Sequence, residues 1–78
     1  MKSQKVEQMK KEISKLIKGL EALKVSYRLQ GRVLNIDLGM GAYSSINVNT
    51  LKVIECVDVQ EWAETFDGIM QQLEKKLN

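Results

Sequence analysis

The chain has no histidine, and its 78 residues include a single cysteine, Cys56. The absence of histidine excludes the serine–histidine and cysteine–histidine nucleophiles of hydrolases, and every metal site that uses an imidazole ligand. One cysteine excludes the cysteine-rich zinc sites and cannot form a disulfide bond within the chain. A lone thiol suggests a reducing compartment.

The sequence also lacks a long apolar run. No stretch approaches the roughly 20 apolar residues of a membrane-spanning helix. The lysine-rich N-terminus is not followed by the apolar core of a signal peptide. We therefore expect a cytoplasmic protein with no membrane partner. Because the chain begins with Met and ends in polar residues, we expect a complete small product.

Composition and length predict one globular domain, residues 1–78, since 44% of the residues are hydrophobic and 28% are charged. A core this small leaves the free energy of folding close to balance, so a second subunit or a partner would help to bury apolar surface. The net charge of +2 is too weak to indicate nucleic-acid binding by itself.

Residues 3–23 have the apolar spacing of an amphipathic helix. The predicted buried stripe is Val6, Met9, Ile13, Leu16, Ile17, Leu20 and Leu23. Lys11, Lys15 and Lys18 fall on the opposite face. A solvated surface is the ordinary interpretation of such lysines, and a basic stripe for phosphate contacts is the alternative.

Residues 33–38 alternate apolar and polar side chains, which predicts a strand with Leu34, Ile36 and Leu38 on one face. Residues 25–29 alternate in the same way. Gly31 between the two runs can adopt a positive φ, so residues 25–38 predict a β-hairpin with its turn at Gln30 and Gly31.

The next segment contains Gly39, Met40 and Gly41. A dinucleotide-binding loop would need a third glycine and a helix directly after it, so a plain loop between strands is the better prediction. Residues 44–56 form either one long strand or two strands separated by a bend at Asn49 and Thr50. The apolar alternation changes phase in this segment, and a β-bulge near Asn49 would restore it.

The pattern predicts that a second helix begins at Asp58, which would be the N-cap of a capping box completed by Glu61. Val57 and Trp62 are placed to form a hydrophobic staple across this start. The buried stripe is expected to include Val59, Trp62, Phe66, Ile69, Met70, Leu73 and Leu77. Gly68 is predicted to lie exposed in mid-helix, and we hypothesise that a partner's backbone approaches it closely.

These elements predict an α+β fold. The expected order is a helix, an antiparallel β-meander of three or four strands and a second helix, with both helices on one face of the sheet. The order resembles that of double-stranded-RNA-binding domains, a likeness of topology without a shared motif. Such domains carry basic residues at the start of the second helix, where this chain has Asp58 and Glu61. We therefore do not expect their function here.

The remaining reactive groups do not predict an enzyme. No carboxylate lies in a sequence context that would raise its pKa, so we interpret the acidic residues as solubility and capping groups. Cys56, between Ile54 and Val57, is expected to be a small buried hydrophobe. No cofactor and no metal ion are expected.

The predicted sheet face opposite the helices carries short hydrogen-bonding side chains that could bind a partner, although antiparallel sheets often leave one face to water. The candidate binding residues are Ser26, Arg28, Gln30, Asn35, Asp37, Asn47, Asn49 and, on the helix, Gly68. The sequence favours a non-enzymatic module that acts by protein–protein contact as an inhibitor or adaptor, with a homodimer as one form. Small inhibitor proteins that phages and mobile elements encode, anti-CRISPR proteins among them, have a similar size. The alternative is a nucleic-acid-binding accessory protein that uses Lys11, Lys15 and Lys18, or Arg28 and Arg32.

Overall fold

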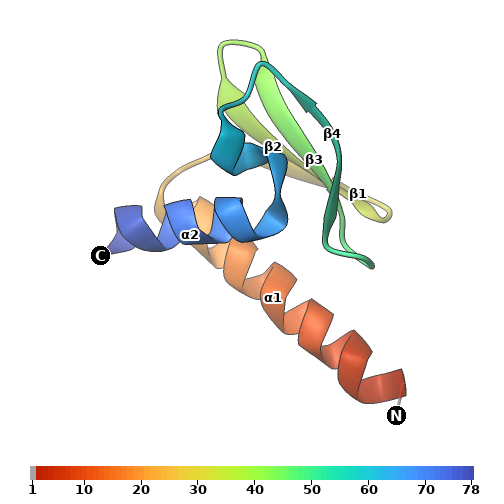
Figure 1. The fold of residues 1–78 in the computed structure, drawn as a ribbon. Coiled ribbons are helices and arrows are strands. Elements are labelled where there is room, and N and C mark those ends of the chain that lie inside the picture. Colours follow the sequence, from red (N-terminus) through yellow and green to blue (C-terminus); the bar gives the residue numbers. More distant parts are fainter. Residues whose placement is uncertain (1) are drawn as a thin grey trace.

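The computed structural model describes residues 2–78, with side chains from Glu7 onward, and has one four-stranded sheet with its helices on one face (Figure 1). The helices are α1 (Lys2–Ala22), the short 3-10 helix η1 (Glu61–Glu64) and α2 (Phe66–Leu77). The strands are β1 (Tyr27–Gln30), β2 (Val33–Gly39), β3 (Ala42–Asn47) and β4 (Lys52–Val57). Each strand pairs antiparallel with the next, in the order β1-β2-β3-β4. The predicted α+β meander is confirmed, with four strands.

The hydrophobic core lies between the sheet and both helices. Its buried apolar side chains are Leu16, Leu20, Leu34, Ile36, Ile46, Ala63, Phe66, Ile69 and Leu73. The sheet contributes Leu34, Ile36 and Ile46, which point to the same side, so both helices cover one face as predicted. We call this the inner face and its opposite the outer face. Phe66 is buried as predicted, whereas Trp62 is only partly buried. The predicted burial of Leu77 is wrong, since this last residue of α2 is 49% exposed.

Helix α1 begins one residue before the predicted range and ends at Ala22, one residue before Leu23, and Figure 1 shows its N-terminal part extending beyond the sheet. The predicted burial of Val6 lies outside the described side chains. Leu16 is its first fully buried side chain. Gly19 is the point of closest approach to α2, because a Cβ at this position would lie 3.2 Å from the Cδ1 atom of Leu73. None of the helices within residues 2–78 is both long enough and apolar enough to cross a membrane.

The hairpin of β1 and β2 is confirmed, but its first strand begins at Tyr27 and not at Val25. The turn is at Gly31 and Arg32, one residue later than predicted, with Gly31 at a φ of +58°. The segment after β2 is a plain turn between strands, as expected, with Met40 and Gly41 at its tip and both at positive φ. Such turns match the twist of an antiparallel pair, so the glycines serve the hairpin geometry.

Residues 44–56 belong to two strands, so the interpretation with a bend at Asn49 and Thr50 is confirmed. The Oδ1 atom of Asn47 stabilises the bend by accepting hydrogen bonds from the backbone N–H of Asn49 (2.8 Å) and of Thr50 (3.3 Å). A bulge does occur, but in β4 and not near Asn49: Ser45 pairs with Glu55 and Ile46 with Val53. Ile54 is the extra residue, and its side chain is 55% exposed.

The predicted start of the second helix at Asp58 is wrong. Asp58 is exposed and has a φ of +52°, which is outside the helical region. Gln60 precedes η1 without any side-chain capping bond, so neither the capping box with Glu61 nor the staple at this point starts a helix. The chain makes one 3-10 turn, becomes extended at Thr65, and only then enters α2.

Thr65 is the true N-cap of α2, because its Oγ1 atom accepts a hydrogen bond from the N–H of Gly68 at 3.0 Å. Gly68 therefore lies in the first turn of α2 and not in mid-helix. A Cβ on Gly68 would overlap the carbonyl oxygen of Trp62 and lie 2.9 Å from Oγ1 of Thr65. The close approach that we hypothesised for a partner is made by the chain's own backbone.

We predict that Gly68→Ala lowers the free energy of unfolding by about 1–3 kcal/mol, since the added methyl group must displace backbone atoms. Chemical denaturation measures this loss. Gln71→Ala, on an exposed position of the same helix, is the matched control and should change stability by no more than about 0.5 kcal/mol. A Gly68→Ala protein as stable as the natural one would show that the contact with Trp62 does not constrain the helix start.

Candidate functional site

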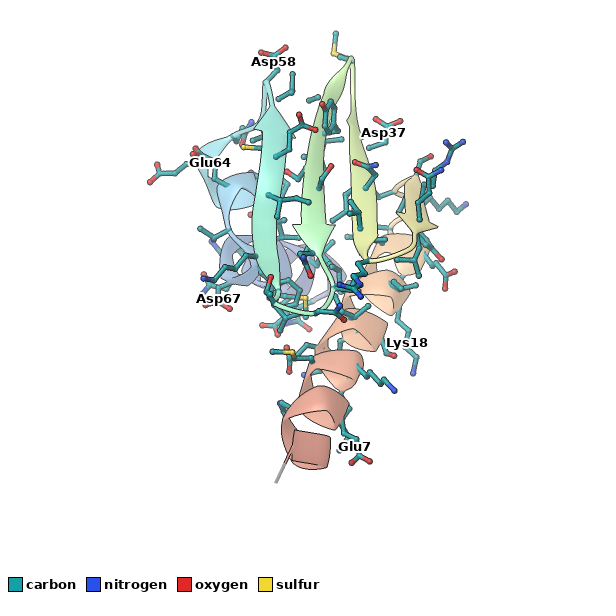
Figure 2. The ribbon with its side chains drawn as sticks, turned by 90° about the vertical axis from the view of Figure 1, so that its right-hand side faces the viewer. Glu7, Lys18, Asp37, Asp58, Glu64 and Asp67 are labelled. Atoms are coloured by element: carbon teal, nitrogen blue, oxygen red, sulfur yellow. The ribbon has the colours of Figure 1, made fainter. Side chains whose placement is uncertain are left out.

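The strand register places the outer-face side chains in three rows across the sheet. The middle row is Arg28, Asn35, Ser45 and Glu55. The row towards the end of β2 is Asp37, Tyr43 and Val57, and the row towards its start is Gln30, Val33, Asn47 and Lys52. Figure 2 looks onto this face, with the helices behind the sheet.

The structure brings most of the candidate binding residues together. Arg28, Gln30, Asn35, Asp37 and Asn47 share the outer face. Ser26 lies exposed beside them just before β1, where its carbonyl oxygen accepts the N–H of Asp37 at 2.9 Å.

Two of the candidates lie apart from this group. Asn49 is exposed in the turn between β3 and β4, beyond the row that contains Asn47. Gly68 lies on α2, on the other side of the sheet, so it does not belong to the same surface. Lys11, Lys15 and Lys18 are exposed along α1, as predicted for a solvated stripe.

Several polar groups of the outer face already have partners within the chain. The Oδ1 atom of Asn35 accepts a hydrogen bond from the Ser45 hydroxyl, and Ser45 is buried. The Oδ1 atom of Asp37 accepts the N–H of Gly39 at 2.8 Å. Together with the Asn47 bonds described above, these contacts fix the side chains in place. These hydrogen bonds hold the outer face rigid. Asn35, Asp37 and Asn47 therefore have fewer free acceptor atoms for a partner than the sequence suggested.

Tyr43 is the residue that sequence reasoning missed. It lies opposite Asp37 on the outer face and is half-buried there. The same alternation that places Ser45 and Asn47 outward would have found it, because all three are two residues apart in β3. A shallow hollow of about 510 Å³ surrounds it. The lining of this hollow includes Arg28, Asn35, Asp37, Tyr43 and Glu55.

Two carboxylates flank the Tyr43 ring. Asp37 lies opposite Tyr43 on β2, and Glu55 lies diagonally across from it on β4. Interaction of the Tyr43 hydroxyl with the Glu55 carboxylate, helped by burial and by the negative charge of Glu55, raises the pKa of Tyr43 above its ordinary value of 10.0. Glu21 acts in the same way on Tyr27, whose hydroxyl lies 2.8 Å from the Oε2 atom of Glu21 and whose pKa is also raised.

Apolar surface is exposed next to these polar rows on β4. Ile54 is 55% exposed and Val57 is 37% exposed. Cys56 is also exposed, so its expected burial is wrong. Cys56 pairs with buried Ser44, but β4 is an edge strand with no neighbour on its other side, and Cys56 remains exposed there.

The described side chains do not form a catalytic arrangement that we recognise. No three histidine, cysteine, aspartate or glutamate side chains in the described part of the chain come together to hold a metal ion. The arrangement on the outer face offers instead an aromatic ring between two carboxylates, with an arginine at the opposite edge. Such a surface suits the binding of a cationic side chain, through the ring face and through charge.

We predict that Glu55→Gln lowers the pKa of Tyr43 towards its ordinary value, as measured by the ultraviolet absorbance of tyrosinate during alkaline titration. Because the folded-state pKa is raised, the stabilisation by Glu55 is complete below about pH 10 and is lost as the pH rises through the folded pKa of Tyr43. Glu21→Gln is the control, since it should shift only Tyr27. Identical titrations of the natural protein and both variants would contradict these assignments.

Comparison of the chain with protein-family models, with curated proteins and with solved structures found no match.

Proposed function

We propose that this protein is a non-enzymatic binding module that acts by protein–protein contact through the outer sheet face. The observation that carries the proposal is Tyr43 between Asp37 and Glu55 on a face that neither helix covers. Tyrosine is enriched in protein interfaces, where its ring supplies apolar area and its hydroxyl a polar contact. The internal hydrogen bonds of Asn35 and Asp37 reduce the entropy that a partner would have to remove.

A second copy of the chain is the partner that this face suits best. The middle row runs from the cation Arg28 at one edge to the anion Glu55 at the other. If two copies meet face to face about a two-fold axis parallel to the strands, the row of one copy runs opposite to the row of the other. Arg28 of each copy then meets Glu55 of its partner, which makes the face self-complementary.

The exposed side chain of Val57 supports the same interpretation, since it lies in the outer-face row of Asp37 and Tyr43 and would lose contact with water in such an assembly. The small core of a 78-residue chain adds a thermodynamic reason, because burial between subunits supplements burial within one. In keeping with the unpaired Cys56, we place the protein in a reducing compartment such as the cytoplasm.

Sedimentation of charge variants tests this proposal. We expect Arg28→Glu alone to weaken self-association about tenfold or more, because it sets two pairs of like charges against each other. The double variant Arg28→Glu with Glu55→Arg should recover association, since the exchange restores both ion pairs. Lys75→Glu, on exposed α2, is the matched control and should have no effect.

A natural protein that does not self-associate, or self-association that Arg28→Glu leaves unchanged, would show that the partner is a different protein. In that case Tyr43→Ala should abolish retention of the partner on the immobilised natural protein, and nuclease treatment should leave retention unchanged. A monomeric protein whose partner binding is insensitive to Tyr43→Ala and to Arg28→Glu would contradict the use of the outer face.

Binding of nucleic acid is the second candidate, and one observation favours it. Lys10, Lys11, Lys15 and Lys18 border one shallow hollow along α1, so their charges are close together. Glu12 borders the same hollow, and Glu7 and Lys18 can be seen along the helix in Figure 2. Arg28 and Arg32 belong to a different element, the β1–β2 hairpin. No aromatic residue interleaves with the lysines to stack on bases.

We expect single-stranded and duplex DNA and RNA to bind no more tightly than about 10⁻⁵ M at about 150 mM salt, the range of non-specific binding. Fluorescence anisotropy with labelled oligonucleotides measures this affinity. A submicromolar affinity that is lost on changing Lys11, Lys15 and Lys18 to Glu would favour the nucleic-acid function over the protein-binding one.

A further inference from the structure

A second hollow, of about 500 Å³, lies at the end of the molecule where the α1–β1 connection, β2, η1 and α2 meet. In Figure 1 this is the region between the loop that leaves α1 and the η1 helix. Core side chains form its floor: Leu20, Ile36, Ile69 and Leu73. Its size is within the usual range of small-molecule sites.

The walls of the hollow are apolar side chains that the fold leaves half-buried: Leu23, Val25, Leu38 and Trp62. Leu38 continues the inner-face alternation of Leu34 and Ile36, both of which are fully buried. It stays partly uncovered because α2 begins only at Phe66, so a 3-10 turn and not a helix lies above this end of the sheet. Ser44 contributes no free polar group, since its hydroxyl donates to the carbonyl oxygen of Ala63 at 2.8 Å.

The polar residues at the border carry mostly positive charge. Lys24, Gln72 and Lys76 line it on the helix side, and Asp37 lines it on the sheet side. The carboxylate of Asp37 already accepts a backbone hydrogen bond from Gly39. Two lysines and one aspartate border the hollow, so the charge of its border is positive, which favours an anion over a cation.

The end of α1 determines where Lys24 lies at the border of the hollow. The N–H of Val25 donates to the carbonyl of Leu20 at 2.8 Å, and the N–H of Lys24 donates to the carbonyl of Glu21 at 3.1 Å. This is the Schellman motif that ends many helices, and it puts Lys24 in the left-handed region at a φ of +60°. Glycine is the favoured residue there. A lysine at this position costs stability relative to glycine, so glycine can replace it without disturbing the helix end.

We propose that this hollow binds a small amphipathic anion, with an apolar body against Trp62 and Leu38 and a carboxylate or phosphate group at Lys24 and Lys76. A free fatty acid and a single-chain phospholipid both carry an anionic group on an apolar chain, so either can supply this ligand. Ser26, Ile36 and Asp37 border both this hollow and the one around Tyr43, but the binding proposed here does not depend on the proposed function.

Trp62 is the only tryptophan of the chain, so its fluorescence reports directly on the hollow. The probe is sodium decanoate below its micellar concentration, compared with decanol and with decyltrimethylammonium. We expect a saturable change of Trp62 fluorescence with decanoate, a weaker one with decanol and none with the cation. Titration with lysophosphatidic acid then distinguishes a lipid phosphate from a free carboxylate as the preferred group.

Lys24→Gly is the decisive variant. We expect it to raise the melting temperature, because glycine suits the positive φ, and to weaken decanoate binding about tenfold while leaving decanol unchanged. Lys76→Gln should weaken decanoate alone in the same way. Lys75→Gln, one position away and outside the hollow, is the matched control.

Three results would overturn the proposal: no saturable binding of decanoate, equal affinity for the anion and the cation, or decanoate affinity unchanged in both Lys24→Gly and Lys76→Gln. Because Lys24→Gly is expected to stabilise the fold, a loss of binding in this variant cannot be attributed to unfolding. Val25→Phe, which adds volume to the wall, should block both decanoate and decanol if it melts like the natural protein. Persistent binding in that folded variant would place the ligand elsewhere.

Discussion

The contact between Trp62 and Gly68 determines how the C-terminal third of the chain is arranged. The carbonyl of Trp62 occupies the space where any larger residue at position 68 would place its Cβ, and the Thr65 hydroxyl caps the helix at the same point. The chain therefore changes direction between η1 and α2. This change lets Phe66, Ile69 and Leu73 reach the core from the first turn of α2 onward. It also lets Leu73 pack against Gly19 of α1, so both helices lie on one sheet face.

The same change of direction explains why two parts of the inner face differ. The sheet residues Leu34 and Ile46 are fully buried. Leu38, further along β2, is only half-buried, and it lines the hollow together with Trp62. If α2 had begun at Asp58, its first turns would have covered this region with helix. The hollow is thus a direct result of a late helix start, and not of a general shortage of apolar side chains.

The parts of the fold that could be predicted from the sequence are those in which local pattern and tertiary packing agree. Leu34 and Ile36 alternate with polar residues and are buried, and the core that contains them also contains Leu16 and Leu20 of α1. The start of α2 could not be predicted, because Asp58 and Glu61 satisfy a local capping pattern that the positive φ of Asp58 prevents. The true start of α2 is marked by Thr65, followed three residues later by Gly68. This pattern also suits a capped helix, but it is a weaker signal in the sequence than Asp58 with Glu61. Cys56 was misplaced because the pattern shows which way a strand residue points, and not whether a helix reaches it.

The candidate site shows a similar division. Alternation within each strand placed Arg28, Asn35 and Asp37 on one face, and the structure brings them together. Their hydrogen bonds within the chain depend on the register between strands, which pairs Asn35 with Ser45, and the sequence alone does not determine that register. The role of Tyr43 was hidden for the same reason, since its carboxylate neighbours come from β2 and β4.

The bulge at Ile54 has a further consequence for how copies of this chain can assemble. Both edge strands have backbone groups that no neighbouring strand of this sheet pairs, and a regular edge of this kind can add strands from other molecules without limit. β1 is only four residues long, and β4 is interrupted by its extra residue, so neither edge is a good template for continuous strand addition. Growth into fibrils along the hydrogen-bonding direction is therefore disfavoured, and an assembly through the sheet face would stop at a closed pair.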